Sequence, residues 1–160
     1  MNVWNDAQPI ENQRVAQIRC AVLSAGDVSF FRKSDYLVKG WLGSEAVSVV
    51  YGDSNCGKSF FGLDMAAHVA SGQSWMGHNV KKGQVLYLAC EGGVKSYGQR
   101  IEAIRHAKAP MYLEGMAENF FLLPIPVDLH GKEDVRAISS AMPEHNFSLI
   151  GVDTLAMSIG

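Results

Sequence analysis

The run 52–59, GDSNCGKS, fits the pattern G-x-x-x-x-G-K-[ST] without a mismatch. The residues before it, 46–51, form a run rich in valine that predicts a buried strand. The residues after it, 58–71, predict a helix that Gly72 ends at the C′ position. A strand, a glycine-rich loop and a helix in this order place successive backbone N–H groups at the positive end of a helix. The sequence therefore predicts a phosphate-binding loop, or P-loop, in an α/β fold.

Strands and helices alternate along the rest of the chain. Short apolar runs bounded by turn residues predict strands at 85–89, 120–123 and 147–152. Apolar residues at one-face spacing predict helices at 97–108, before Pro110, and at 134–142. This alternation predicts a parallel sheet that binds its ligands at the carboxyl ends of its strands.

The composition narrows the class of protein. A chain of 160 residues can bury a core of its own, and we expect a core domain at 36–160 after an N-terminal segment, 1–35, of uncertain structure. The net charge of −2 shows no general basic excess, so any nucleic-acid surface would have to be local. The three cysteines lack metal or disulfide spacing, which favours a reducing compartment. No signal-peptide or membrane-spanning segment is evident, so we expect a cytoplasmic protein with no membrane partner.

The P-loop supplies the first set of candidate residues. Lys58 can bridge the β- and γ-phosphates of a nucleotide, and the Ser59 hydroxyl can ligate Mg²⁺. Cys56 stands where such loops often carry a smaller residue. We expect nucleotide contacts from the whole run: Gly52, Asp53, Ser54, Asn55, Cys56, Gly57, Lys58, Ser59 and Phe60.

Two carboxylates follow predicted strands. Asp153 comes after 147–152, where it can hold Mg²⁺ directly or through water; the other interpretation is a turn or capping residue. Glu91 comes after 85–89, where it can orient the water that attacks the γ-phosphate and partly deprotonate it. The other interpretation of Glu91 is an exposed acid in the glycine-rich turn 91–93.

Other polar and small residues have simpler interpretations. We expect His68 to be packed or half-exposed, and Trp75 to pack against the sheet. Gly151, inside a predicted strand, indicates a close backbone approach or a bulge. The solvated face of the helix at 97–108 is expected to carry Arg100, Arg105 and Lys108.

Three stretches together resemble the RecA-like P-loop ATPases: 51–61, 85–92 and 149–156. The resemblance is closest to the AAA family ATPases of the RepA-like replicative helicase type, and it covers about 36–160. It implies a RecA-like P-loop NTPase core that uses ATP and Mg²⁺, with Glu91 and Lys58 as catalytic residues and Ser59 with Asp153 at the metal. It also implies single-stranded DNA as a partner and a homo-oligomer, either a hexamer or a filament.

The resemblance also predicts that the core is incomplete on its C-terminal side. In RecA-like proteins, a strand that follows the position of Asp153 lies between the strands at 46–51 and 147–152. Only seven residues follow Asp153 here. We therefore expect the N-terminal part of a longer protein or a truncated gene product, with weak nucleotide binding and poor hydrolysis in isolation.

These inferences favour ATP binding and Mg²⁺-dependent ATP hydrolysis, coupled to DNA replication or recombination in a helicase-like motor. A nucleotide-dependent scaffold or an inactive fragment is the non-enzymatic alternative. A P-loop small-molecule kinase is a less favoured alternative, because no arginine-rich lid segment is evident.

Overall fold

The computed structural model describes residues 8–26, 35–108 and 110–158. The chain forms two compact units, Met1–Ser34 and Asp35–Gly160, which are described separately.

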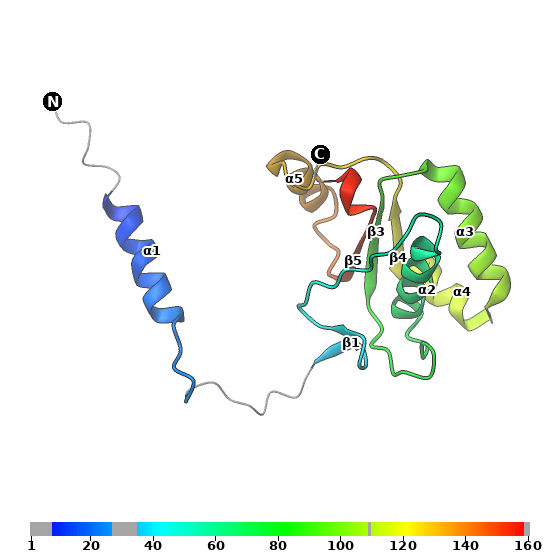
Figure 1. Ribbon diagram of the computed structural model, residues 1–160, viewed down its shortest axis with the longest axis horizontal. Helices are drawn as coiled ribbons and strands as arrows, with labels where there is room; N and C mark the ends of the chain where they lie inside the picture. The colour runs from blue at the N-terminus through cyan, green and yellow to red at the C-terminus, as the bar shows by residue number, and fades with distance from the viewer. Residues whose placement is uncertain (1–7, 27–34, 109, 159–160) are drawn as a thin grey trace. The chain divides into compact units, whose positions relative to one another are not determined.

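The first unit contains one helix, α1 (Gln8–Ala21), among its described residues (Figure 1). Residues 1–7 and 27–34 of the N-terminal segment lie outside the described residues. Three apolar side chains on α1 and just after it are exposed: Val15, Ile18 and Val22. No helix in the described ranges is long and apolar enough to cross a membrane.

The second unit is built on a three-stranded parallel sheet. Its central strand is β3 (Gln84–Ala89), with β4 (Phe120–Leu123) on one side and β5 (Phe147–Asp153) on the other. The three predicted strands and their parallel arrangement are confirmed. Because Ala89 lies opposite Asp153, β3 and β5 end at the same edge of the sheet.

Helices cover both faces of the sheet, in three layers (Figure 1). The helices α2 (Lys58–Ser71), α3 (Gly93–Ala107) and α4 (Pro110–Asn119) lie on one face, and α5 (Lys132–Ala141) lies on the other. Alternate residues of β3 divide the core between these layers. Val85, Tyr87 and Ala89 pack with the first group of helices, and Leu86 and Leu88 lie in a second cluster with Ile138 of α5.

A small antiparallel hairpin, β1 (Tyr36–Val38) and β2 (Leu42–Gly43), precedes the P-loop segment. The sequence did not indicate this pairing. Trp75 packs edge-on against Trp41 and Phe61, with ring centroids 5.1 and 5.4 Å apart, and is buried. The expectation that Trp75 is a packed residue is therefore correct, but its ring partners lie in the hairpin turn and on α2 instead of on the parallel sheet. A single 3₁₀ turn, η1 (Leu155–Met157), follows β5.

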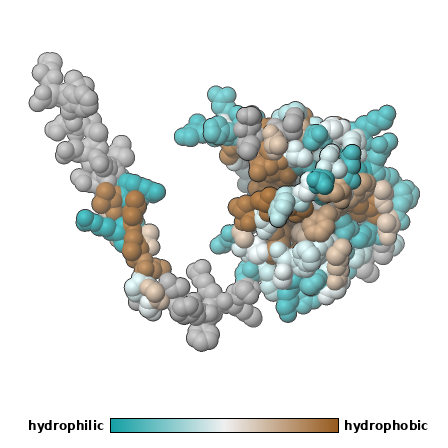
Figure 2. Space-filling model, in the orientation of Figure 1, coloured by the Kyte–Doolittle hydropathy of each residue, from teal (hydrophilic) through white to brown (hydrophobic). Residues whose placement is uncertain are grey.

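The predicted strand at 46–51 is wrong. Val47 is 96% exposed and Tyr51 91% exposed, and among the described residues no strand pairs with this segment. A strand persists only where its N–H and C=O groups find hydrogen-bond partners. The described strand that could have paired with 46–51 is β5, and β5 pairs with β3 alone. The result is a partial RecA-like P-loop core. Figure 2 shows hydrophobic residues exposed on the face where this segment and β5 lie.

Candidate functional site

The P-loop connects the exposed segment to α2, whose predicted extent is confirmed. Asn55 and Gly57 have φ values of 61° and 91°, in the left-handed region. Residues with this conformation beside right-handed ones turn consecutive N–H groups toward one concave side of the backbone. A Cβ on Gly52 would lie 3.1 Å from the sulfur of Cys56, so the loop closes tightly around this glycine. Residues 51–57 are exposed, and the loop is open to solvent.

The Lys58 ammonium is held inside the loop. Its Nζ donates to the carbonyl oxygens of Gly52 and Asp53 at 2.9 and 2.6 Å and lies 3.7 Å from the sulfur of Cys56. Neutral carbonyls are weaker acceptors for an ammonium than ionised phosphate oxygens. An anion in the loop would therefore compete successfully for this charge.

Asp153 ends β5 as a buried carboxylate, not as an exposed turn residue. Its Oδ2 accepts hydrogen bonds from the hydroxyls of Tyr97, at 2.7 Å, and Tyr87, at 3.2 Å. Its backbone carbonyl accepts from the N–H of Cys90 at 2.8 Å. Burial, and then the Asp153 charge, raise the pKa of Tyr87 well above its usual value. Burial and the hydrogen bond to Asp153 do the same to the pKa of Tyr97, so both phenols remain proton donors near neutral pH.

Glu91 lies at the same edge of the sheet as Asp153, two residues beyond the end of β3. Its side chain is exposed, and its Oε2 accepts a hydrogen bond from Thr154 Oγ1 at 3.4 Å. Thr154 directly follows Asp153, so this contact ties the ends of two neighbouring strands together. The geometry leaves the Glu91 carboxylate accessible to water.

The ring of Tyr87 links this edge to the P-loop helix. A Cβ on Gly62, in the first turns of α2, would lie 3.0 Å from the Tyr87 hydroxyl oxygen. A Cβ on Gly151 would lie 2.8 Å from Cδ2 of the same ring. The close approach predicted at Gly151 is therefore confirmed. The helix that begins at Lys58 and the carboxylate of Asp153 both contact Tyr87.

The residues present suit a magnesium ion bound with a nucleotide. Ser59 and Asp153 offer the hard oxygen ligands that Mg²⁺ prefers. Among the described residues, no group of three or more His, Cys, Asp or Glu could hold a metal alone. Mg²⁺ typically takes only one or two protein carboxylates and completes its shell with phosphates and water. The donor set fits that pattern.

Sequence reasoning missed the two tyrosines. Tyr87 sits inside an apolar run and Tyr97 on the apolar face of a helix, so both resembled ordinary core residues. One signal in the sequence could have found them, because a buried phenol needs a hydrogen-bond partner. The pairing of β3 with β5 brings Asp153 close enough to be that acceptor. The predicted solvated role of Arg100 is also incomplete, because its guanidinium carbon lies 4.9 Å from the Tyr97 ring centroid and 5.9 Å from that of Phe60.

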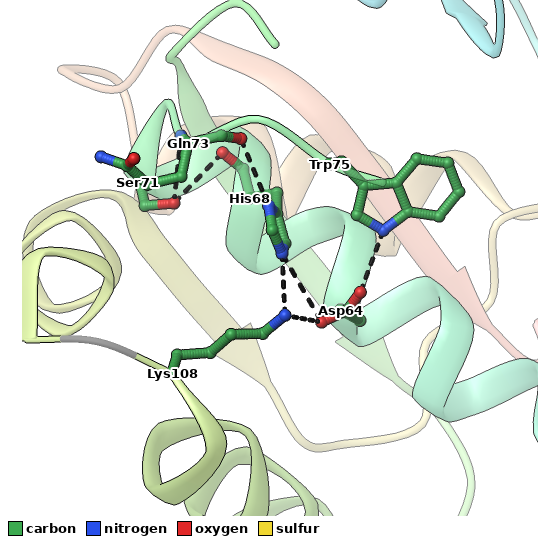
Figure 3. Close-up of polar contacts among 6 residues, drawn as sticks. All are labelled: Asp64, His68, Ser71, Gln73, Trp75 and Lys108. Atoms are coloured by element: carbon green, nitrogen blue, oxygen red, sulfur yellow. Dashed lines mark hydrogen bonds and ion pairs between the residues drawn. The ribbon is translucent and has the colours of Figure 1, made fainter. Parts of the chain in front are cut away.

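A polar cluster fixes the C-terminal half of α2, away from the P-loop (Figure 3). Lys108 Nζ lies 2.9 Å from Asp64 Oδ1 and 2.9 Å from His68 Nε2, so the predicted solvated role of Lys108 is wrong. His68 is buried, and its Nδ1 lies 3.2 Å from the Gln73 carbonyl. Because a carbonyl only accepts and an ammonium only donates, the neutral ring carries its proton on Nδ1. Burial, and then the Lys108 charge, lower the pKa of His68.

A three-layer α/β unit with a glycine-rich phosphate-binding loop at the start of a helix defines the class of P-loop proteins. A family model described as AAA domain matches residues 13–160. The chain therefore belongs to this family of AAA-type P-loop ATPases, which indicates nucleotide binding and ATPase activity. Comparison with curated proteins gives no match.

Proposed function

We propose that this chain binds ATP together with Mg²⁺ and hydrolyses it, with Glu91 as the base that activates water. The observation that supports this most is the convergence at one edge of the sheet. Glu91 follows β3 and Asp153 ends the adjacent parallel strand β5, and the Tyr87 ring joins Asp153 to the helix that begins at Lys58. The carboxyl edge of a parallel sheet is where α/β proteins bind their ligands.

Each residue has a distinct role in the proposed reaction. The amides of 52–59 and the Lys58 ammonium hold the phosphate chain. Ser59 and Asp153 hold the metal, which neutralises phosphate charge when it is bound. Glu91 accepts a proton from the attacking water and orients it toward the γ-phosphate, while the Thr154 hydroxyl limits the rotation of the Glu91 carboxylate.

Replacing Glu91 by Gln tests the role of the base. The amide keeps the size and polarity of the side chain but cannot accept the proton, so we expect turnover to fall by about 10²- to 10⁴-fold. ATP affinity should change little, because the phosphates are held by the loop. The matched control is Glu114→Gln, which alters an exposed carboxylate on α4. Turnover by Glu91→Gln at the rate of the unaltered chain would remove Glu91 from the mechanism.

We also propose that hydrolysis is coupled to single-stranded DNA in a homo-oligomer. The partial RecA-like core and the AAA-type family support this assignment. ATP hydrolysis should then rise when single-stranded DNA is added, and the stimulation should weaken with increasing salt. A phosphate transfer that requires a small acceptor would instead favour the kinase alternative. Thermal stabilisation by MgATP without any turnover would favour a nucleotide-dependent scaffold.

A further inference from the structure

Two buried phenols converge on a single oxygen of Asp153. Tyr97 and Tyr87 both donate to Oδ2, from α3 and from β3 respectively. Within the described ranges, no hydrogen bond ends on Oδ1, and Oδ1 is not among the buried side-chain atoms left without a partner. Oδ1 is therefore the carboxylate oxygen that has no partner among the described residues and keeps some contact with solvent, although Asp153 as a whole is only 8% exposed.

The packing around the two rings holds the phenols in place. Tyr97 is buried, with the guanidinium of Arg100 over its ring. Two glycines approach the Tyr87 ring closely: a Cβ on Gly151 would lie 2.8 Å from its Cδ2, and a Cβ on Gly62 would lie 3.0 Å from its hydroxyl oxygen. It also stacks on Phe120, with ring centroids 6.1 Å apart and an interplanar angle of 20°. Rings confined in this way keep their hydroxyls directed at Asp153.

We propose that Tyr97 and Tyr87 are positioning residues that turn Oδ2 of Asp153 into the core and so present Oδ1 to the metal. This inference rests on the proposed function, in which Asp153 is a metal ligand. Residues that hydrogen-bond a ligating carboxylate fix its orientation, and their loss typically lowers metal affinity by about 10- to 100-fold. Tyr97 is the stronger donor because its bond is the shorter, at 2.7 Å against 3.2 Å.

Replacing Tyr97 by Phe removes one hydroxyl and keeps the buried ring. The test measures Mg²⁺ affinity in the presence of saturating ADP, and separately ADP affinity in excess chelator. We expect Tyr97→Phe to weaken Mg²⁺ binding by about 10-fold or more, while ADP affinity without metal stays unchanged. Tyr87→Phe should weaken Mg²⁺ binding by a smaller factor, and the double variant by a larger one. The matched control, Tyr112→Phe, changes a ring beside His68 and should leave both affinities unchanged.

The outcomes separate a positioning role from a purely structural one. A structural role would lower the Tm and both affinities together, whereas positioning changes only the Mg²⁺ affinity. Wild-type Mg²⁺ affinity in a folded Tyr97→Phe variant would overturn the inference. Should that variant fail to fold, unchanged Mg²⁺ affinity in Tyr87→Phe would overturn it equally. If Mg²⁺ has no effect on ADP binding by the unaltered chain, the proposed function fails instead, so the two failures are distinguishable.

Discussion

The ion pair between Asp64 and Lys108 gives a quantitative test of how the P-loop helix is held. The Asp64 carboxylate accepts from the indole N–H of Trp75 at 2.9 Å and lies 2.9 Å from the Lys108 ammonium (Figure 3). The two side chains of the pair are 29% and 23% exposed. Asp64→Asn and Lys108→Met each leave one charge partly buried without its partner.

The expected magnitude follows from this burial. Removing one member of a fully buried pair costs about 3–5 kcal/mol. Solvent reaches about a quarter of each side chain here, so we expect about 2 kcal/mol for each single variant. In a chain of this size that loss corresponds to a decrease in Tm of about 4–8 °C. The double variant leaves no unpaired charge, so it should cost about as much as one single variant, with a coupling of about 1–2 kcal/mol.

The assay is urea denaturation of the four proteins, followed by circular dichroism so that the altered environment of Trp75 does not disturb the signal. The pair Lys81 and Asp35 is the control, because its atoms lie 3.1 Å apart but the side chains are 59% and 65% exposed. Asp35→Asn should cost less than about 0.5 kcal/mol. The reasoning is refuted if the two single effects simply add in the double variant, or if Asp64→Asn costs no more than Asp35→Asn.

The remaining predictions concern α2 and the two helices that lie on the same face of the sheet, α3 and α4. The pKa of His68 is lowered in the folded state, so the unfolded chain takes up a proton at a higher pH than the folded chain does. The free energy of unfolding should therefore be level above about pH 7.5 and fall as the pH drops through about 6.5. His68→Gln should flatten this slope in denaturation series from about pH 5.5 to 7.5, whereas His106→Gln, at an exposed side chain, should not. Gly115→Ala should destabilise the fold by about 1–3 kcal/mol, because its Cβ would lie 2.5 Å from the Cα of Ser71. At Gly98 no atom lies within 4 Å of the new Cβ, so Gly98→Ala should stabilise α3 by up to about 1 kcal/mol in thermal denaturation. Equal effects of the two substitutions would contradict the argument that α4 packs too closely on Ser71 to accept a side chain at Gly115.

The sequence predicted the elements whose signals are local. The helix α2 ends where Gly72 adopts a φ of 72° and donates to the His68 carbonyl, as its position after the apolar run indicated. The strands β3 and β5 appeared as short apolar runs between turn residues. The helix α4 was missed because Pro110 was interpreted only as a stop, although proline is also favoured as the first residue of a helix.

Long-range pairing explains the remaining errors. The segment 46–51 has strand-forming residues, but a strand depends on a neighbour, and periodicity in one segment does not show whether a neighbour is present. Among the site residues, Glu91 and Asp153 could be selected because carboxylates at strand ends are chemically distinctive. Their catalytic and metal-binding roles stay predictions. Tyr87 and Tyr97 became visible only once the register of β3 against β5 was known.

The unpaired edge of β5 and the exposed valine-rich segment 46–51 have a consequence for the handling of this protein. Both offer N–H and C=O groups that no neighbouring strand uses among the described residues, and Ile150, Val47 and Val49 add exposed apolar side chains beside them. Such surfaces act as templates for intermolecular β-pairing and aggregation. At high concentration these two segments are therefore where self-association should begin, and a lysine placed at Val47 or Val49 should raise solubility without touching the nucleotide loop.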